Sequence, residues 1–111
     1  MQIAILLYDH VTALDAVGPY EVLSRLPGAE SVFVATHRGP VRCDTRQLAL
    51  VADANLADVP TPDIIVVPGW SGDRQTALLA PGPVHDWLHD ADRHTTWTTS
   101  ACTGSLILAA A

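Results

Sequence analysis

The residues best suited to chemistry are a cysteine and its small neighbours near the end of the chain. Cys102 follows the β-branched run 95–101, which favours a strand, and precedes Gly104, where an apolar helical pattern begins. A nucleophile on such a tight strand-to-helix turn stands exposed above the sheet, and the helix N-terminus favours the reactive thiolate. A free cysteine is also often a small buried apolar residue. The pattern alone leaves these two interpretations of Cys102 evenly balanced.

Asp15 is the acidic residue best placed to assist a nucleophile. It lies just ahead of the expected start of a helix that follows the first strand. An aspartate there commonly caps the free N–H groups of the helix. Alternatively, its carboxylate faces Cys102 and transfers a proton. Glu21 falls in the middle of the same helix, so we expect it on the solvated side.

Gly69 is a candidate for binding developing negative charge. It follows the apolar strand 63–67 after one proline, and a glycine there permits a positive φ or a close approach of the backbone to a ligand. The amides of Gly69 and Thr103 are predicted to form an anion hole during attack by Cys102, unless the glycine merely closes a turn. Trp70 comes next, and because tryptophan resists a positive φ, it is expected to alter the anion hole or to narrow the pocket.

The spacing of the cysteines and histidines predicts no metal site. Cys43 and Cys102 have neither the spacing of a metal site nor that of a disulfide framework, and Cys43 is expected to be structural. His85 and His89 are four residues apart, but their neighbours in the sequence supply no further ligands. Both histidines are therefore expected at the surface.

Alternating strand and helix patterns must position these candidates. The expected elements are strand 2–8, a helix over 14–26 that is regular from about Gly18, strand 31–36, a hairpin over 41–51, a loop or single turn at 56–62, strand 63–67, a short helix 74–79, helix 83–93, strand 95–101 and a helix from Gly104. The residues expected on buried helix faces are Leu14, Val17, Val22, Leu23 and Leu26 in the first helix, and Val84, Trp87, Leu88 and Ala91 in helix 83–93.

This alternation is typical of a single α/β domain, residues 1–111, with an open, mostly parallel, flavodoxin-like sheet flanked by helices. Ligands of such sheets bind beyond the carboxyl ends of the strands. Asp15, Gly69 and Cys102 all follow strand ends, so we expect them to meet at one edge. The chain stops within an apolar helical pattern, so the domain is expected to be incomplete at its C-terminal end.

Composition excludes several classes of function. A net charge of -6 with no cluster of Lys or Arg argues against a nucleic-acid partner. No apolar run has the length that a membrane span needs. Cysteines without a disulfide framework suit a reducing cytoplasm, which is the expected location.

Four segments together resemble the ThiJ/PfpI family, whose fold is that of the class I glutamine amidotransferases. They are QIAILLY at 2–8, LDAVGPYEVL at 14–23, DIIVVPG at 63–69 and TSACTGSL at 99–106. Within the family, the chain is similar to the isonitrile hydratase branch, which carries an early LDxxGPYEV segment and a later CTGS turn. The resemblance implies addition of water to an isonitrile, a small-molecule substrate, to give an N-substituted formamide. It also implies a homodimer and no cofactor or metal.

The same resemblance implies roles for particular residues. Cys102 is the implied nucleophile, Asp15 the catalytic acid and base, and Thr103 a further catalytic residue. The residues assigned to the substrate and anion-hole region are Gly69, Trp70 and Gly18. Trp70 is a departure, because the family usually has a second glycine there. The family's domain is also longer than this chain.

Two other functions remain open. The same fold precedes DNA-binding domains in AraC-type regulators, so the chain could be a ligand-sensing domain. It could also belong to an enzyme of the family that acts on reactive carbonyls with the same cysteine. Such enzymes normally carry a glutamate where Asp15 stands, which weighs against them. A member that kept the cysteine turn but lost activity is the remaining alternative.

Overall fold

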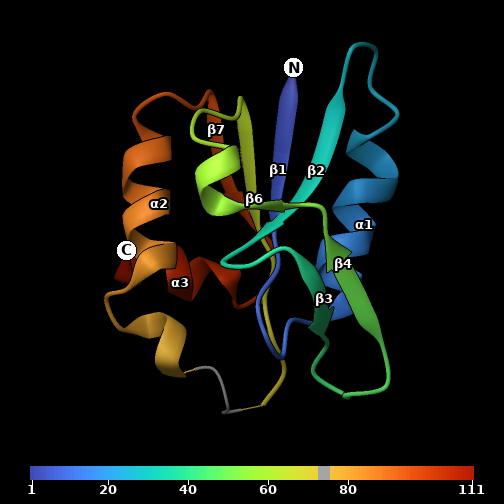
Figure 1. The fold of residues 1–111 in the computed structure, drawn as a ribbon, viewed down its shortest axis with the longest axis vertical. Helices are drawn as coiled ribbons and strands as arrows, with labels where there is room; N and C mark the ends of the chain where they lie inside the picture. The colour runs from blue at the N-terminus through green and yellow to red at the C-terminus, as the bar shows by residue number, and fades with distance from the viewer. Residues whose placement is uncertain (73–75) are drawn as a thin grey trace.

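The computed structural model describes residues 1–72 and 76–111. Its centre is a five-stranded sheet in which all neighbouring strands are parallel (Figure 1). In spatial order the strands are β5 (Ala54–Asn55), β2 (Glu30–Ala35), β1 (Gln2–Leu6), β6 (Ile64–Val67) and β7 (Trp97–Ser100). The predicted open, parallel α/β sheet is confirmed.

β1 is the central strand because its side chains are apolar on both faces. Residues 3–6 are completely buried. In the register of the sheet, Ile5 lies between Phe33 of β2 and Val66 of β6. A strand without a polar face is stable only where other strands and covering helices surround it.

In the described part of the chain, three α-helices flank the sheet: α1 (Ala13–Leu23), α2 (Pro83–Asp92) and α3 (Gly104–Ala110). Figure 1 shows α1 on one side of the strands and α2 and α3 on the other. The chain steps from β1 to β2 in one direction and from β6 to β7 in the opposite direction. Right-handed crossovers then place the helices on opposite faces. In open α/β sheets, ligands bind beyond the strand ends where the direction changes, here between β1 and β6.

The predicted hairpin is also present. β3 (Gly39–Arg42) and β4 (Ala49–Ala52) form a separate antiparallel pair. The two-residue strand β5 and the 3₁₀ helix η1 (Leu56–Asp58) follow. η1 falls within the loop or single turn predicted at 56–62, whereas β5 is not predicted, because it is too short to show an alternating pattern.

The first helix begins earlier than predicted. α1 starts at Ala13, directly after Thr12, rather than near Gly18. The Asp15 N–H donates to the Thr12 carbonyl oxygen at 3.1 Å, which closes the first turn. Pro19 therefore lies inside the helix. The prediction fails because it assumes that proline is confined to the first turn, where it is best tolerated.

The expected buried face of α1 is wrong in part. Leu14 and Val22 are exposed, at 74% and 69% of their full accessibility. The helix also ends earlier than predicted, at Leu23, so Leu26 lies beyond it and is exposed as well. Ala16 is instead the fully buried residue of the helix. Because α1 carries apolar residues around most of its circumference, their spacing does not select one face.

The buried face of α2 is predicted correctly except for one histidine. The confirmed buried residues are Val84, Trp87, Leu88 and Ala91. His85 is expected at the surface but is only 6% exposed, and its Nε2 lies 2.6 Å from the Leu78 carbonyl oxygen. Leu78 belongs to the 3₁₀ helix η2 (Thr76–Leu79), the described part of the predicted helix 74–79. Residues 73–75 lie outside the described residues.

The start of α3 packs against the end of β6 so closely that residue 104 must be glycine. A Cβ at Gly104 would collide with the Val67 carbonyl oxygen and lie 2.8 Å from that of Pro68. Both obstacles are backbone atoms, which cannot rotate aside. Gly104 therefore sets the distance between the cysteine turn and the end of β6.

Replacing Gly104 by alanine is expected to destabilise the domain by more than about 3 kcal/mol, or to prevent folding, because the added methyl group overlaps backbone. Urea unfolding followed by circular dichroism measures the loss. Gly18→Ala is the matched control, since a Cβ there would meet only Leu14 Cδ1, at 3.9 Å. Alanine is favoured over glycine inside a helix by about 0.5–1 kcal/mol. Equal stability of the two variants would contradict the described packing of α3 on β6.

Candidate active site

Three segments that are far apart in the sequence meet at the carboxyl edge of the sheet. They are the first turn of α1, which follows β1, residues 68–70, which follow β6, and the turn 101–104, which follows β7. β6 lies between β1 and β7, so the segment after β6 can contact both others. The expected meeting of strand ends is therefore a consequence of the strand order.

Cys102 occupies a strained position between β7 and α3. Its φ is 51°, in the left-handed region, which costs a residue with a Cβ about 1–2 kcal/mol. The flanking backbone holds this turn, because Ala101 N donates to Val67 O and Gly104 N donates to Ala101 O, each at 3.0 Å. Cys102 is exposed, whereas Cys43 is buried. The turn has the geometry of a nucleophile elbow, and the reactivity of its thiol stays a prediction.

Asp15 points from α1 toward the end of β6. Its Oδ2 accepts a hydrogen bond from Gly69 N at 3.3 Å. Asp15 is the third residue of the helix and half-buried. Its side chain thus bonds to a neighbouring segment, and the capping role that the sequence also allows is not the one observed.

Gly69 is the point at which all three segments converge. A Cβ there would lie 2.6 Å from Thr103 Oγ1, 2.7 Å from Thr103 N and 3.0 Å from Asp15 Oδ2. Gly69 is not among the residues of positive φ. Of the two reasons that the sequence offers for this glycine, the structure supports the close approach and not the backbone conformation.

Thr103 joins the cysteine turn to the segment after β6. Its Oγ1 accepts a hydrogen bond from Trp70 N at 2.9 Å and lies 3.0 Å from Trp70 O, to which it donates. One hydroxyl therefore satisfies both backbone groups of Trp70. Because Thr103 is adjacent to Cys102, these bonds fix the cysteine turn relative to Gly69.

Trp70 is not among the residues of positive φ, so the expected conflict does not arise. Its side chain is buried, and its backbone forms an antiparallel bridge with Val11. The amide of Gly69, expected to face a substrate, donates to Asp15 instead. For Gly69 and Thr103 to form an anion hole, the Gly69 N–H must therefore break its hydrogen bond to Asp15 and donate to the substrate instead.

Gly18 lies one helical turn beyond Asp15. The contacts that link Asp15, Gly69 and Thr103 do not include it, and an added Cβ would meet only Leu14 within 4 Å. Its assignment to the substrate region stays a prediction.

Tyr8 is a residue of this region that the sequence pattern does not reveal. It is buried, and its hydroxyl donates to the Pro68 carbonyl oxygen at 2.6 Å. Burial raises the pKa of the Tyr8 hydroxyl well above its ordinary value, and the nearby charges of Asp15, Cys102 and Asp44 raise it further. In the sequence, Tyr8 is simply the last member of an apolar run. Its only signal is a hydroxyl that burial obliges to find a partner.

Residues 1–111 match the DJ-1/PfpI family. The chain belongs to the DJ-1/PfpI family. This confirms the resemblance to the family also called ThiJ/PfpI.

Individual members of the DJ-1/PfpI family are similar to the whole chain. It is 36% identical over 111 residues to isonitrile hydratase of Pseudomonas putida, covering 100% of this chain and 47% of that protein. A ThiJ/PfpI family protein from Pseudomonas syringae has a TM-score of 0.90 at 33% identity, over 98% of this chain and 45% of that one. The chain thus spans about half the length of these relatives.

An AraC family transcriptional regulator from Pseudomonas putida shares the fold, with a TM-score of 0.73 over 96% of this chain and 58% of the regulator. Its identity of 19% supports a common fold alone. The architecture of a DJ-1/PfpI domain therefore does not by itself separate an enzyme from a regulator.

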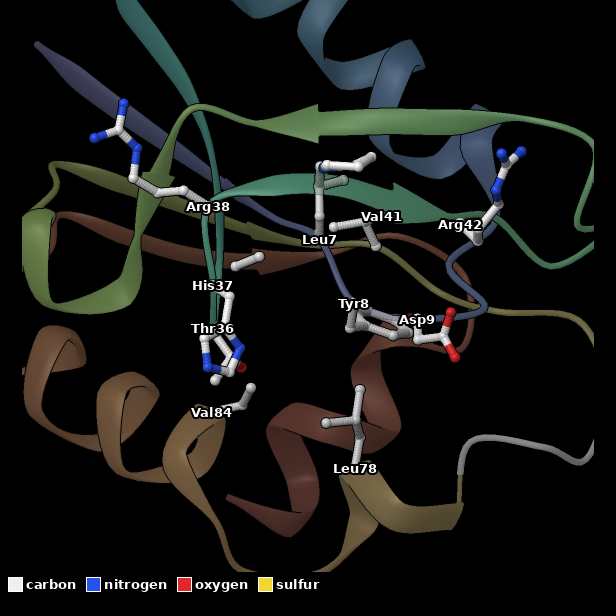
Figure 2. A pocket seen from close by; sticks show the side chains of 12 residues that line it. Leu7, Tyr8, Asp9, Thr36, His37, Arg38, Val41, Arg42, Leu78 and Val84 are labelled. Atoms are coloured by element: carbon white, nitrogen blue, oxygen red, sulfur yellow. The ribbon is translucent and has the colours of Figure 1, made fainter.

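A cavity of about 470 Å³ lies next to the candidate site of this DJ-1/PfpI domain, between the β3–β4 hairpin and the start of α2 (Figure 2). Leu78 and Val84 contribute to its apolar lining, whereas Figure 2 shows the guanidinium groups of Arg38 and Arg42 directed away from them. Tyr8 lines the cavity, but Cys102 does not. The cavity thus adjoins the candidate site through Tyr8 and does not include Cys102. Among residues 1–72 and 76–111, no three His, Cys, Asp or Glu side chains gather in a way that could hold a metal ion.

The buried hydroxyl of Tyr8 gives a testable contribution to stability. Tyr8→Phe is expected to cost about 1–3 kcal/mol at neutral pH, because the Pro68 carbonyl loses its partner. A raised pKa in the folded state means that this contribution is present below about pH 10, the ordinary value for tyrosine, and is lost as the pH rises further. The stability of Tyr8→Phe should therefore fall less steeply above about pH 10 than that of the parent protein.

Urea unfolding at a series of pH values measures both effects. Tyr20→Phe, which removes an exposed hydroxyl from α1, is the control and should change stability at neutral pH by less than about 0.5 kcal/mol. A Tyr8→Phe variant as stable as this control would rule out the described role of the hydroxyl.

Proposed function

We propose that the chain carries the cysteine–aspartate site of an isonitrile hydratase, which adds water to an isonitrile to give an N-substituted formamide. The observation that carries the proposal is the convergence of Asp15 and Thr103 on Gly69, beside a strained and exposed Cys102. The similarity to isonitrile hydratase of Pseudomonas putida supports the choice of reaction.

The first step forms a covalent intermediate. The Cys102 thiolate attacks the terminal carbon of R–N≡C and forms a C–S bond, while protonated Asp15 delivers its proton to the same carbon. The product is a thioimidate, R–N=CH–S–Cys102, and Asp15 is left as a carboxylate. A strained, exposed nucleophile can approach a narrow linear substrate with little obstruction, which favours this attack.

The second step releases the formamide. The Asp15 carboxylate takes a proton from water as the water oxygen adds to the thioimidate carbon. Protonated Asp15 then gives its proton to the nitrogen and takes the proton of the new hydroxyl as C=O forms and the C–S bond breaks. R–NH–CHO leaves, and both the thiolate and protonated Asp15 are restored. One carboxylate thus acts as acid and then as base.

In this scheme, Thr103 holds the cysteine turn at a fixed position relative to Gly69. Its hydroxyl bonds to both backbone groups of Trp70. Removal of those bonds would let the turn 101–104 move relative to Asp15. We propose this alignment as the contribution of Thr103 to the reaction.

A ligand-sensing domain is the second candidate, favoured by the fold shared with the AraC family regulator. A sensor needs a pocket but no proton donor beside a nucleophile. The Asp15 carboxyl group, held at Gly69 next to the cysteine turn, therefore favours the enzyme. An enzyme that acts on reactive carbonyls is a weaker candidate, because the acid in this site is an aspartate and not the glutamate expected for that group.

The site proposal is tested by Asp15→Asn in the full chain. Formamide production from a simple alkyl isonitrile, measured by liquid chromatography, is expected to fall by about 10²–10⁴-fold, because the amide cannot transfer the proton. The asparagine oxygen can still accept from Gly69 N, so the fold should be retained.

Cys102→Ala should be equally inactive, and Asp90→Asn on the exposed face of α2 is the control that should keep activity. Full activity of Asp15→Asn would contradict the proposed role of the carboxylate. A parent protein that makes no formamide, yet binds small molecules, would favour the sensor.

We also propose that the protein acts as a homodimer in the cytoplasm. The exposed apolar side chains of α1, Leu14 and Val22 among them, suit a contact with a second copy. The free thiols Cys43 and Cys102 suit a reducing compartment. Among the described residues, no helix has the length and apolarity to span a membrane.

Val22→Lys is expected to convert a dimer into monomers, because a charge on a buried apolar interface is costly. Sedimentation velocity measures the change, and Asp90→Lys, a charge change on α2, should leave the dimer intact. A parent protein that sediments as a monomer would contradict the proposed assembly.

A further inference from the structure

The hydroxyl of Thr12 is not used in the way that its position suggests. Thr12 is the residue before α1, where a threonine commonly accepts a hydrogen bond from the first turn of the helix. Its side chain makes no such bond. Instead, Thr12 Oγ1 donates to Asp44 Oδ2 at 2.7 Å. The start of α1 is therefore attached to a residue of the hairpin region, 32 positions further along the chain.

The carboxylate of Asp44 is itself held in place. Its Oδ1 accepts from Thr45 N at 2.8 Å, and Asp44 N donates to the Val11 carbonyl oxygen at 3.0 Å. The hydrogen bond from Thr12 holds the pKa of the Asp44 carboxyl below its ordinary value, so the group is a charged acceptor at neutral pH. Hydrogen bonds to a charged acceptor are stronger than those between neutral groups.

The hairpin holds the segment before α1 through its backbone as well. His10 N donates to the Arg42 carbonyl oxygen at 2.9 Å, and Val11 forms a parallel bridge with Cys43. Two side chains of the hairpin region add further contacts: Arg46 donates to Asp9 Oδ1 at 2.8 Å, and Asp44 accepts from Thr12, the residue directly before α1. The Asp44 contact is thus the one of these two that holds the residue next to α1, and substitution can remove it without touching the backbone.

From Thr12 the connection reaches the candidate site in two ways. Thr12 N donates to the Gly69 carbonyl oxygen at 2.9 Å. Asp15, in the first turn of the helix that Thr12 starts, accepts from Gly69 N at 3.3 Å. Thr12 therefore binds the carbonyl oxygen of Gly69, and Asp15 binds its N–H.

We propose that Asp44 is a positioning residue for Asp15: by holding the Thr12 hydroxyl, it fixes the first turn of α1 against Gly69 and keeps the Asp15 carboxylate beside the cysteine turn. Asp44 itself touches neither the cysteine nor the reacting atoms. Its catalytic consequence rests on the proposed function, but its effect on the Gly69–Asp15 contact does not.

The test uses Asp44→Ala in the full chain with two independent readouts. In the formamide assay, kcat is expected to fall by about ten- to a hundredfold with KM little changed, because the acid and not the substrate is displaced. By hydrogen exchange followed by NMR, the Gly69 amide is expected to exchange about tenfold faster, while the amide of Ile65 in β6 is unchanged.

Three further variants identify the bond responsible. Thr12→Val should reproduce the effects of Asp44→Ala, the double variant should be no worse than either single one, and Thr12→Ser, which keeps the donor, should restore the parent values. Asp58→Ala is the matched control, since it also removes a carboxylate that accepts a backbone N–H, from Asn55 at 3.2 Å, but after β5 and away from Gly69.

Each outcome decides the proposal. Unchanged kcat and unchanged Gly69 exchange in Asp44→Ala would overturn it, and so would equal acceleration of Gly69 and Ile65, which would mean a general loss of stability. If the parent protein makes no formamide, the proposed reaction fails, and selective acceleration of the Gly69 amide still supports the positioning role.

Discussion

The whole carboxyl edge of the sheet depends on a close approach of backbone to backbone at Gly69 and Gly104. Each lacks a Cβ at a place where one would overlap neighbouring atoms. This allows the cysteine turn, the end of β6 and the start of α1 to lie within hydrogen-bond distance of one another. Side chains as short as those of Asp15 and Thr103 can then span the gaps. With larger residues in place of the glycines, these side chains would not reach.

The polar contacts of the site follow from this closeness. The side-chain oxygens of Asp15 and Thr103 form hydrogen bonds with backbone groups of residues 69 and 70. Because the backbone groups of that segment have partners, the segment can remain buried at a strand end, where an unsatisfied N–H or C=O would be costly. The same bonds help to offset the strain of the left-handed turn at Cys102. Stability and candidate chemistry therefore use the same atoms.

Much of this arrangement is encoded in local patterns. The apolar runs predict the strands, and their alternation with helices predicts a parallel sheet, whose strand ends then bring Asp15, Gly69 and Cys102 together. The start of α1 is not predictable in this way, because it depends on Thr12 and its partners after β3 and β6. Nor is the burial of His85, which depends on the placement of η2 over α2. Tyr8 and Asp44 escape notice for the same reason: their partners are distant in the sequence, and a single polar residue in a loop or at a strand end has no period.

Pro19 inside α1 has a mechanical consequence for the acid of the site. A proline has no N–H to give to the carbonyl four residues before it, and that carbonyl belongs to Asp15. The first turn of α1 is therefore joined to the rest of the helix by one hydrogen bond fewer than in a regular helix. The orientation of this turn therefore depends less on the rigidity of the helix and more on contacts with neighbouring segments. Because the hydrogen bond to the Asp15 carbonyl oxygen is missing, the position of the first turn is set by its contacts with the hairpin and the end of β6.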